Sequence, residues 1–242
     1  MIMEQAHENK MTRDETLKVA LMVGKILLKS GAETYRVEDT INRFCIANGY
    51  EVDIFVTPTV IILGNEQVDS FNCVSRIRYR TTNLGMISEM NDMSYKFERW
   101  PMSYRGTMAW LEEKLKAQVP YGKWKVCLAS AIASASFSAM LGGNSHDFIA
   151  AFITGGIAML VLKQIAGYRP SAFWENALAG VAIGVVALIC CAVSVQCTME
   201  KIIVGALMPF VPGVAFTNGL RDYMAGDLLS GNARKAEALL FD

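Results

Sequence analysis

The sequence predicts an α-helical membrane protein with an N-terminal α+β domain over residues 1–120 and a transmembrane domain over residues 121–242. Hydrophobic residues make up 52% of the 242 residues and charged residues 19%, which is fewer charges than the roughly 25% of a soluble domain. The charges are also unevenly distributed. Residues 1–120 contain 15 Lys and Arg with 16 Asp and Glu, whereas Asp147 is the only formal charge between Val126 and Leu162.

The first 120 residues carry both helical and strand patterns. Amphipathic helices are predicted over residues 12–29 and 33–47, because apolar residues recur at helical spacing and Ser30-Gly31 and Asn48-Gly49 end the two runs. The β-branched run 51–64 predicts two strands or one bent strand, with Pro58 at an edge or bulge. Residues 68–80 include another strand. Helices over 83–97 and 103–119 then lead to the membrane.

Four apolar stretches are long enough to cross a bilayer, whose hydrocarbon core of about 30 Å needs roughly 20 helical residues. They cover residues 124–141, 148–165, 177–199 and 202–220. A buried helix of a soluble protein is the alternative for any one of them, but four in succession favour lipid. Basic residues lie at the end of the second stretch (Lys163), in the loop after it (Arg169) and after the fourth stretch (Arg221). The positive-inside rule therefore places the N-terminal domain in the cytoplasm.

Small residues form stripes on two of these stretches. Ser130, Ser134 and Ser138 share a helix face in the first, and Gly180 and Gly184 do so in the third. Such stripes allow close packing of helices in the membrane. A hydroxyl-lined path for a polar solute is the alternative that the sequence leaves open.

The fourth stretch and the tail that follows it hold the candidate binding residues. Proline removes a backbone donor and clashes with the preceding helical turn, so Pro209, Pro212 and Gly213 predict a broken helix. The exposed ends of half-helices bind polar solutes in transporters, although a simple kink is the alternative. Beyond the break, an arginine can hold a carboxylate and acidic groups can carry a proton. The candidate substrate-binding residues are Pro209, Pro212, Gly213, Asn218, Arg221, Asp222 and Asp227.

No motif for catalysis, metal or cofactor binding is recognised. The six cysteines form no CxxC pair and the two histidines lie far apart, which argues against a zinc site or a disulfide framework. GxSxG, P-loop, GxGxxG and HExxH motifs are absent from the sequence. We therefore expect neither an enzyme nor a cofactor. The alternatives are a membrane-anchored hydrolase with its active site in residues 1–120, and a regulatory subunit of a transporter.

Two motifs resemble the threonine/serine exporter family, ThrE. One covers residues 30–43 (SGAETYRVEDTINR), in which Gly31, Glu33, Arg36 and Glu38 form the motif of the cytoplasmic domain; the other combines Pro212-Gly213 with the tail 221–234. Length and layout look most like the larger, YjjP-type subunit of split exporters. The resemblance implies a bacterial inner-membrane protein that exports threonine and serine, or a dicarboxylate such as succinate. It also implies that a small YjjB-like membrane subunit is the partner, and that the protein forms a homo- or hetero-oligomer.

The resemblance also predicts a fifth span at the C-terminal end. Fused family members resemble two membrane halves of about five spans each, and we expect the fifth span to begin after Glu237. The chain ends at Phe241-Asp242.

A proton gradient is the expected energy source for transport, because the sequence has acidic groups and no ATP-binding motif.

Overall fold

The computed structural model describes residues 11–64, 73–77, 80–100, 102–116, 121–165 and 172–240. Arg169, which entered the orientation argument, lies outside these residues. The chain divides into two units. Unit 1 comprises residues 1–119 and 214–236, and unit 2 comprises residues 120–213 and 237–242. Residues 214–236, which we predicted as part of the transmembrane domain, therefore group with the N-terminal residues, because their polar side chains bond to the loop before the second helix.

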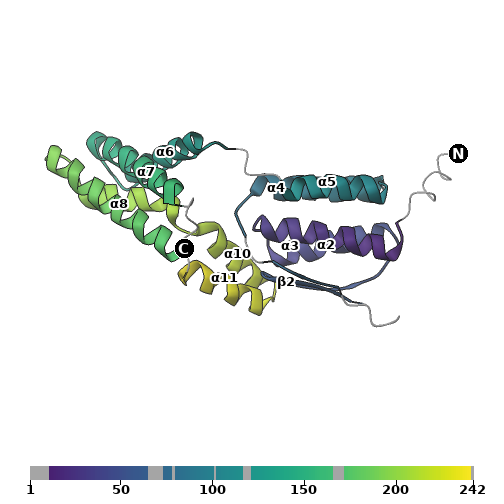
Figure 1. Ribbon diagram of the computed structural model, residues 1–242. Helices are drawn as coiled ribbons and strands as arrows, with labels where there is room; N and C mark the ends of the chain where they lie inside the picture. Colours follow the sequence, from purple (N-terminus) through teal and green to yellow (C-terminus); the bar gives the residue numbers. More distant parts are fainter. Residues whose placement is uncertain are drawn as a thin grey trace. The chain divides into compact units, whose positions relative to one another are not determined.

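Two helices form the centre of unit 1 (Figure 1). α2 spans Arg13–Lys29 and α3 spans Thr34–Ala47, as the apolar periodicity predicts. A capping box begins α2, since the Thr12 hydroxyl accepts from the Glu15 N–H and the Glu15 carboxylate accepts from the Thr12 N–H. The core of this unit is formed by fully buried apolar side chains from both helices, among them Leu17, Leu27, Leu28, Ile41 and Phe44.

A three-stranded antiparallel sheet packs against these helices. The order is β1 (Asp53–Thr57), β2 (Val60–Gly64) and β3 (Cys73–Arg76). The run 51–64 is thus a hairpin, and Pro58 lies in its turn, where no ladder hydrogen bond is lost. Val56 pairs with Ile61 and Ile54 with Leu63. Because side chains alternate along a strand, these residues share the face toward α2 and α3.

The remaining helices of unit 1 come from distant parts of the sequence. α4 (Leu84–Arg99) and α5 (Tyr104–Lys116) are close to their predicted bounds. α4 contacts α2 and α3, and α5 contacts α2, burying Met90, Phe97 and Leu111 in the common core. α10 (Gly213–Met224) and α11 (Leu228–Leu240) follow much later in the chain, and their residues within 214–236 belong to unit 1. A turn with Gly226 at φ +89° joins them.

Unit 2 is a bundle of apolar helices. It contains α6 (Lys123–Met140), α7 (Ser145–Ile165), α8 (Ala172–Val193), α9 (Met199–Leu207) and the 3-10 turn η2 (Met208–Phe210). α7 contacts α6, α8 and α9. The long apolar side chains of unit 2 mostly face outward. The contacts between its helices are made largely by small residues, such as Ala150, Ala151 and Ala158. Such exposure of apolar side chains is typical of helices solvated by lipid.

The described residues contain fewer candidate membrane spans than predicted. Among the described residues, two helices are long and apolar enough to cross a bilayer, over Ser145–Ile165 and Trp174–Val193. A third span exists if α9 with η2 and α10 count as one broken span. The expectation of about four is corrected chiefly at α6, because its 18 residues include Lys123, Lys125 and four serines. A fifth span stays a prediction.

Candidate functional site

The candidate site is built on the loop between α2 and α3. Gly31 adopts φ +83°, and a Cβ there would lie 3.2 Å from the Thr81 carbonyl oxygen, so the turn requires glycine. Glu33 is the N-cap residue of α3, but its own side chain makes no capping hydrogen bond. The first N–H groups of α3 therefore need an acceptor from elsewhere in the chain.

Asp222 of α10 supplies that acceptor. Its Oδ1 accepts from the Thr34 N–H at 3.2 Å and from the Thr34 hydroxyl at 2.8 Å. The carboxylate is completely buried, and it lies at the N-terminus of α3, where a negative charge is favoured. A residue 188 positions further along the chain thus caps α3.

Arg234 of α11 is the cationic partner of Asp222. Its Nε donates to Asp222 Oδ2 at 2.8 Å, and its Nη2 donates to the Ala32 carbonyl oxygen. Arg234 is 4% exposed, so both charges of this pair are buried. A buried pair is tolerated only when further hydrogen bonds satisfy both groups, and here the loop backbone and Thr34 provide them.

Glu33 lies between two guanidinium groups. Arg221 Nη1 donates to Oε1 of Glu33 at 2.6 Å, and Arg36 Nε lies 3.0 Å from Oε2. The Glu33 side chain is 6% exposed, whereas those of Arg221 and Arg36 are 54% and 37% exposed. A buried carboxylate therefore holds two cations at the surface of unit 1. Two positive charges share one negative charge there.

Two glycines set the position of α10 against α11. A Cβ on Gly231 would lie 2.8 Å from the Tyr223 ring and 3.0 Å from the Gly219 carbonyl oxygen. A Cβ on Gly219 would lie 3.3 Å from that of Arg234. This close approach places Arg234 beside Asp222. Asn218, on the same helix, donates from Nδ2 to the Gly31 carbonyl oxygen at 2.9 Å.

Glu38 adds a carboxylate with no cationic partner among the described residues. It is half-buried one turn after Thr34, and its Oε1 accepts from the Val56 N–H at 3.0 Å. Burial raises the pKa of Glu38, the Val56 hydrogen bond opposes this shift, and the negative charges of Asp227 and Asp222 raise the pKa further. Asp227 is the cap of α11, since its Oδ1 accepts from the Ser230 N–H at 3.1 Å.

The structure thus brings together most of the residues named from the sequence. Asn218, Arg221, Asp222 and Asp227 belong to unit 1 with Gly31, Glu33, Arg36 and Glu38. Pro209, Pro212 and Gly213 belong to unit 2, at the break between η2 and α10. Thr34 and Arg234 were not among the candidate residues. Both lie in the two motifs, but nothing in a motif states which residue of one pairs with which residue of the other.

The serine stripe of α6 is a packing surface in unit 2. A Cβ on Gly155 of α7 would lie 2.0 Å from Ser134 Oγ, and one on Gly205 of α9 would lie 2.9 Å from the Ser138 Cβ. Ser130 Oγ donates to the Gly155 carbonyl oxygen at 3.2 Å. Such closeness favours the packing interpretation over a solute path. Gly180 and Gly184 differ, because a Cβ on either would meet no atom within 4 Å.

Asp147, the isolated charge of the apolar region, joins two loops of unit 2. It is fully buried, and its carboxylate accepts from the Thr198 N–H at 2.5 Å and the Asn144 N–H at 3.0 Å. Thr198 begins α9, so this carboxylate also caps a helix from a distant residue. Asn144 Nδ2 donates to the Gln196 carbonyl oxygen at 2.8 Å. In this arrangement the Asp147 carboxylate holds the two loops together.

These features define a helical membrane protein that carries a charged cluster on a unit outside its apolar bundle. Within the described ranges no group of three or more His, Cys, Asp or Glu side chains is placed to hold a metal ion. The family model described as "Putative threonine/serine exporter" (ThrE) matches residues 18–241. The chain belongs to this family, which is a family of transporters.

A curated relative agrees with this assignment. The chain is 22% identical over 234 residues to the "Threonine/serine exporter" of Corynebacterium glutamicum, covering 93% of this chain and 48% of that protein. The chain therefore spans about half the length of this relative. No solved structure matches the chain.

Proposed function

We propose that this chain is one subunit of a secondary exporter in the bacterial inner membrane, with residues 1–120 in the cytoplasm. Its substrates are small polar metabolites that carry a carboxylate, namely threonine and serine or a dicarboxylate such as succinate. Family membership supports export. The observation that carries the choice of substrate class is the pair Arg221 and Arg36 around the buried carboxylate of Glu33.

Arg221 is the residue that we assign to the substrate carboxylate. One of its nitrogens donates to Glu33, and more than half of the side chain is open to solvent. A guanidinium group has five N–H donors in a planar fork, so an incoming carboxylate can take two of those that remain. Glu33 holds the fork in place, and Arg36 adds a second positive charge on the other side of Glu33.

The other candidates of unit 1 have supporting roles in this proposal. Asp222 and Asn218 are buried and bond to the loop 31–34, so they position Arg221 on α10. Glu38 is the group that we assign to the proton of a proton-driven cycle, because it is half-buried and the negative charges of Asp227 and Asp222 help to raise its pKa. The broken helix at Pro209, Pro212 and Gly213 is the proposed place where the solute enters the apolar unit.

A second membrane subunit, small and YjjB-like, completes the proposed exporter. The length relation supports this, because the chain covers 48% of a relative that is called an exporter as a whole. A homo- or hetero-oligomer that buries the outward-facing residues of α8 is consistent with the open surface at Gly180 and Gly184.

Efflux measurements test this proposal. Cells that express the chain with and without the candidate partner are loaded with labelled threonine, serine or succinate, and the release is followed. Export is expected only when both subunits are present. Release by the chain alone, or by the partner alone, would contradict the two-subunit proposal; the latter outcome would make this chain a regulatory subunit.

Arg221→Gln tests the site within that experiment. The substitution keeps hydrogen-bonding capacity but removes the charge, so we expect efflux to fall at least tenfold while the amount of protein in the membrane stays the same. Arg105→Gln is the matched control, because Arg105 is an exposed arginine of α5 in the same unit. Unchanged efflux in Arg221→Gln would reject the assignment of Arg221.

A further inference from the structure

The hairpin formed by α10 and α11 exposes a row of large apolar side chains. On α10, Phe216, Leu220 and Met224 recur at every fourth position and are 48%, 47% and 82% exposed. On α11, Leu228 and Leu229 are 62% and 67% exposed. Single apolar side chains are normal on a protein surface, whereas five of them on two adjacent helices form a patch that marks an interaction surface.

The hydrogen bonds of the hairpin indicate that these apolar side chains share one face. Asn218 and Asp222 of α10 bond to the loop 31–34, and so does Arg234 of α11. The helices lie side by side (Figure 1), since the two glycines described above allow their close approach. A helix turns by about 100° per residue, so the apolar residues of each helix lie opposite its bonded polar residues. Both apolar faces therefore point away from the loop.

The chain enters this hairpin directly from the apolar bundle. Leu207, Met208 and Val211 at the end of that bundle are exposed, and so is Val214 in the first turn of α10. Outward-facing apolar residues thus continue along the sequence from α9 through η2 into α10. In the bundle such exposure is typical of helices solvated by lipid, and the same solvent accounts for the hairpin.

The length and the polar border of the hairpin favour a position at the membrane surface. α10 and α11 have 12 and 13 residues, and each alone is shorter than the roughly 20 residues that cross a bilayer. Arg221 is exposed beside the apolar row, and the Lys235 ammonium lies 4.3 Å from the centre of the Tyr223 ring. Long basic side chains and tyrosine commonly flank the apolar face of helices that lie in the interface.

We propose that the α10–α11 hairpin lies in the surface of the bilayer, with its five exposed apolar side chains inserted at the boundary between headgroups and acyl chains. The partner of this surface is lipid. The polar face of the hairpin holds the loop 31–34, so the buried pair of Asp222 and Arg234 joins α3 to a membrane-bound hairpin. This inference goes beyond the proposed export activity and does not depend on it.

Site-specific photo-crosslinking of the full chain in native membranes tests the proposal. p-Benzoylphenylalanine replaces Leu220 or Leu229 in cells that make radiolabelled phospholipid and express the chain with the candidate partner subunit. The excited benzophenone inserts into a neighbouring C–H bond, so its adduct identifies what lies against the helix. We expect phospholipid adducts, with yields close to that at Ile153, an exposed position of α7 in the apolar bundle.

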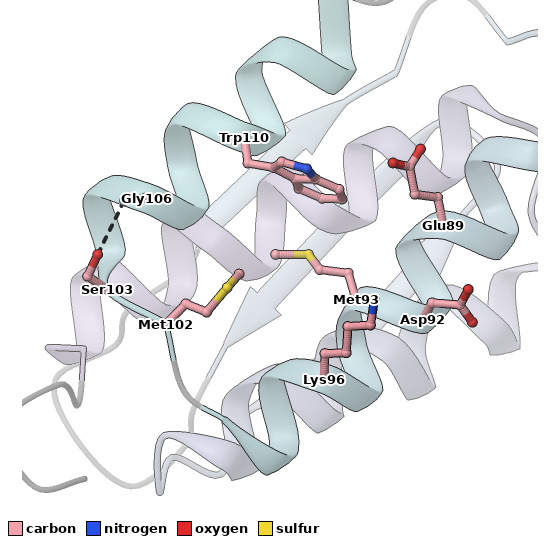
Figure 2. Close-up of a pocket in the computed structure, with 8 residues that line it drawn as sticks. All are labelled: Glu89, Asp92, Met93, Lys96, Met102, Ser103, Gly106 and Trp110. Atoms are coloured by element: carbon pink, nitrogen blue, oxygen red, sulfur yellow. Dashed lines mark hydrogen bonds between the residues drawn. The ribbon is translucent and has the colours of Figure 1, made fainter. Parts of the chain in front are cut away.

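Met102 is the matched control position in unit 1. It is an exposed apolar residue like those of the hairpin, but it lines a cavity of about 570 Å³ between α4 and α5 (Figure 2). Glu89, Asp92 and Lys96 line the same cavity, so charges of both signs lie around it. Such a surface favours water over lipid, and we expect no phospholipid adduct at Met102.

A charge introduced into the apolar row tests whether insertion depends on it. Met224→Glu should abolish most of the phospholipid adduct at Leu220 and Leu229, because a carboxylate is costly in the membrane. Met224 is 82% exposed, so the substitution should not disturb folding. Met102→Glu is the control and should leave both yields unchanged.

Three results would overturn the proposal. In the first, the reporters at Leu220 and Leu229 crosslink to protein, either the partner subunit or a second copy of the chain. In the second, they give as little adduct as Met102, which would place the hairpin in water. In the third, Met224→Glu leaves the yields of phospholipid adduct unchanged. Export of metabolites plays no part in this readout, so failure of the proposed function would leave its result intact.

Discussion

Removing the Asp222 carboxylate should destabilise unit 1 more than any other single change at its charged cluster. Asp222→Ala leaves Arg234 buried without a carboxylate and the Thr34 N–H without an acceptor. Breaking a buried pair from one side costs about 3–5 kcal/mol. Every 1.4 kcal/mol changes an equilibrium constant tenfold. The fraction of molecules in which unit 1 is open should therefore rise by roughly two to three and a half orders of magnitude.

Cys45 provides the assay for this prediction. Its thiol is fully buried in the core of unit 1, and burial raises its pKa to about 12. It should therefore react with a thiol reagent only when unit 1 opens. The labelling rate of the Cys45 peptide is measured by mass spectrometry on the full chain in detergent, which distinguishes it from the other five cysteines.

Two variants make the result specific to the buried charge. Asp222→Asn keeps an acceptor for Thr34 but loses the charge opposite Arg234, so it should cost about 1.5–3 kcal/mol. Asp92→Ala removes an exposed carboxylate of α4 and should stay within about 0.5 kcal/mol of the wild type. If Cys45 in Asp222→Ala is labelled no faster than in Asp92→Ala, the cap and the buried pair contribute nothing, and the reasoning is refuted.

Two further predictions concern pH and helix packing. Because the pKa of Glu38 is raised in the folded state, its ionisation costs stability as the pH rises above the ordinary carboxyl value of about 4.3. Glu38→Gln should therefore have a higher Tm than the wild type at pH 8, and the difference should vanish toward pH 4; an equal difference at both pH values would contradict this. In unit 2, Gly155→Ala places a Cβ 2.0 Å from Ser134 Oγ and should cost about 1–3 kcal/mol. Gly180→Ala meets no atom and should leave the Tm of the detergent-solubilised protein unchanged or raised; equal Tm values for the two variants would disprove the packing assignment.

Local signals in the sequence predicted most helices and strands of this protein. α2, α3, α4 and α7 lie within about three residues of their predicted bounds, because apolar periodicity and capping residues act over one or two helical turns. The break near Pro209 and Pro212 was predicted for the same reason, since proline blocks a helix locally. α6 was predicted as a membrane span from its small and apolar residues. Its four serines are polar and lower its hydropathy.

The candidate site could be predicted only in its parts. Glu33, Arg36, Arg221 and Asp222 were all recognised as charged residues in two motifs, and Asp222 was expected to bind substrate. In the structure Asp222 caps α3 and pairs with Arg234, and its role toward a substrate stays a prediction. A carboxylate in a sequence looks the same whether it is exposed or buried, so its role depends on what packs around it.

The sequence by itself determined the apolar bundle, the polar N-terminal part, the helix break and the family to which the chain belongs. Only the tertiary structure decided that residues 214–236 leave the bundle and pack on the loop 31–34, almost 190 residues away in the chain. The physical reason is that periodicity, capping and proline act between neighbours in sequence, whereas burying Asp222 with Arg234 requires distant segments to satisfy each other's charges and backbone groups.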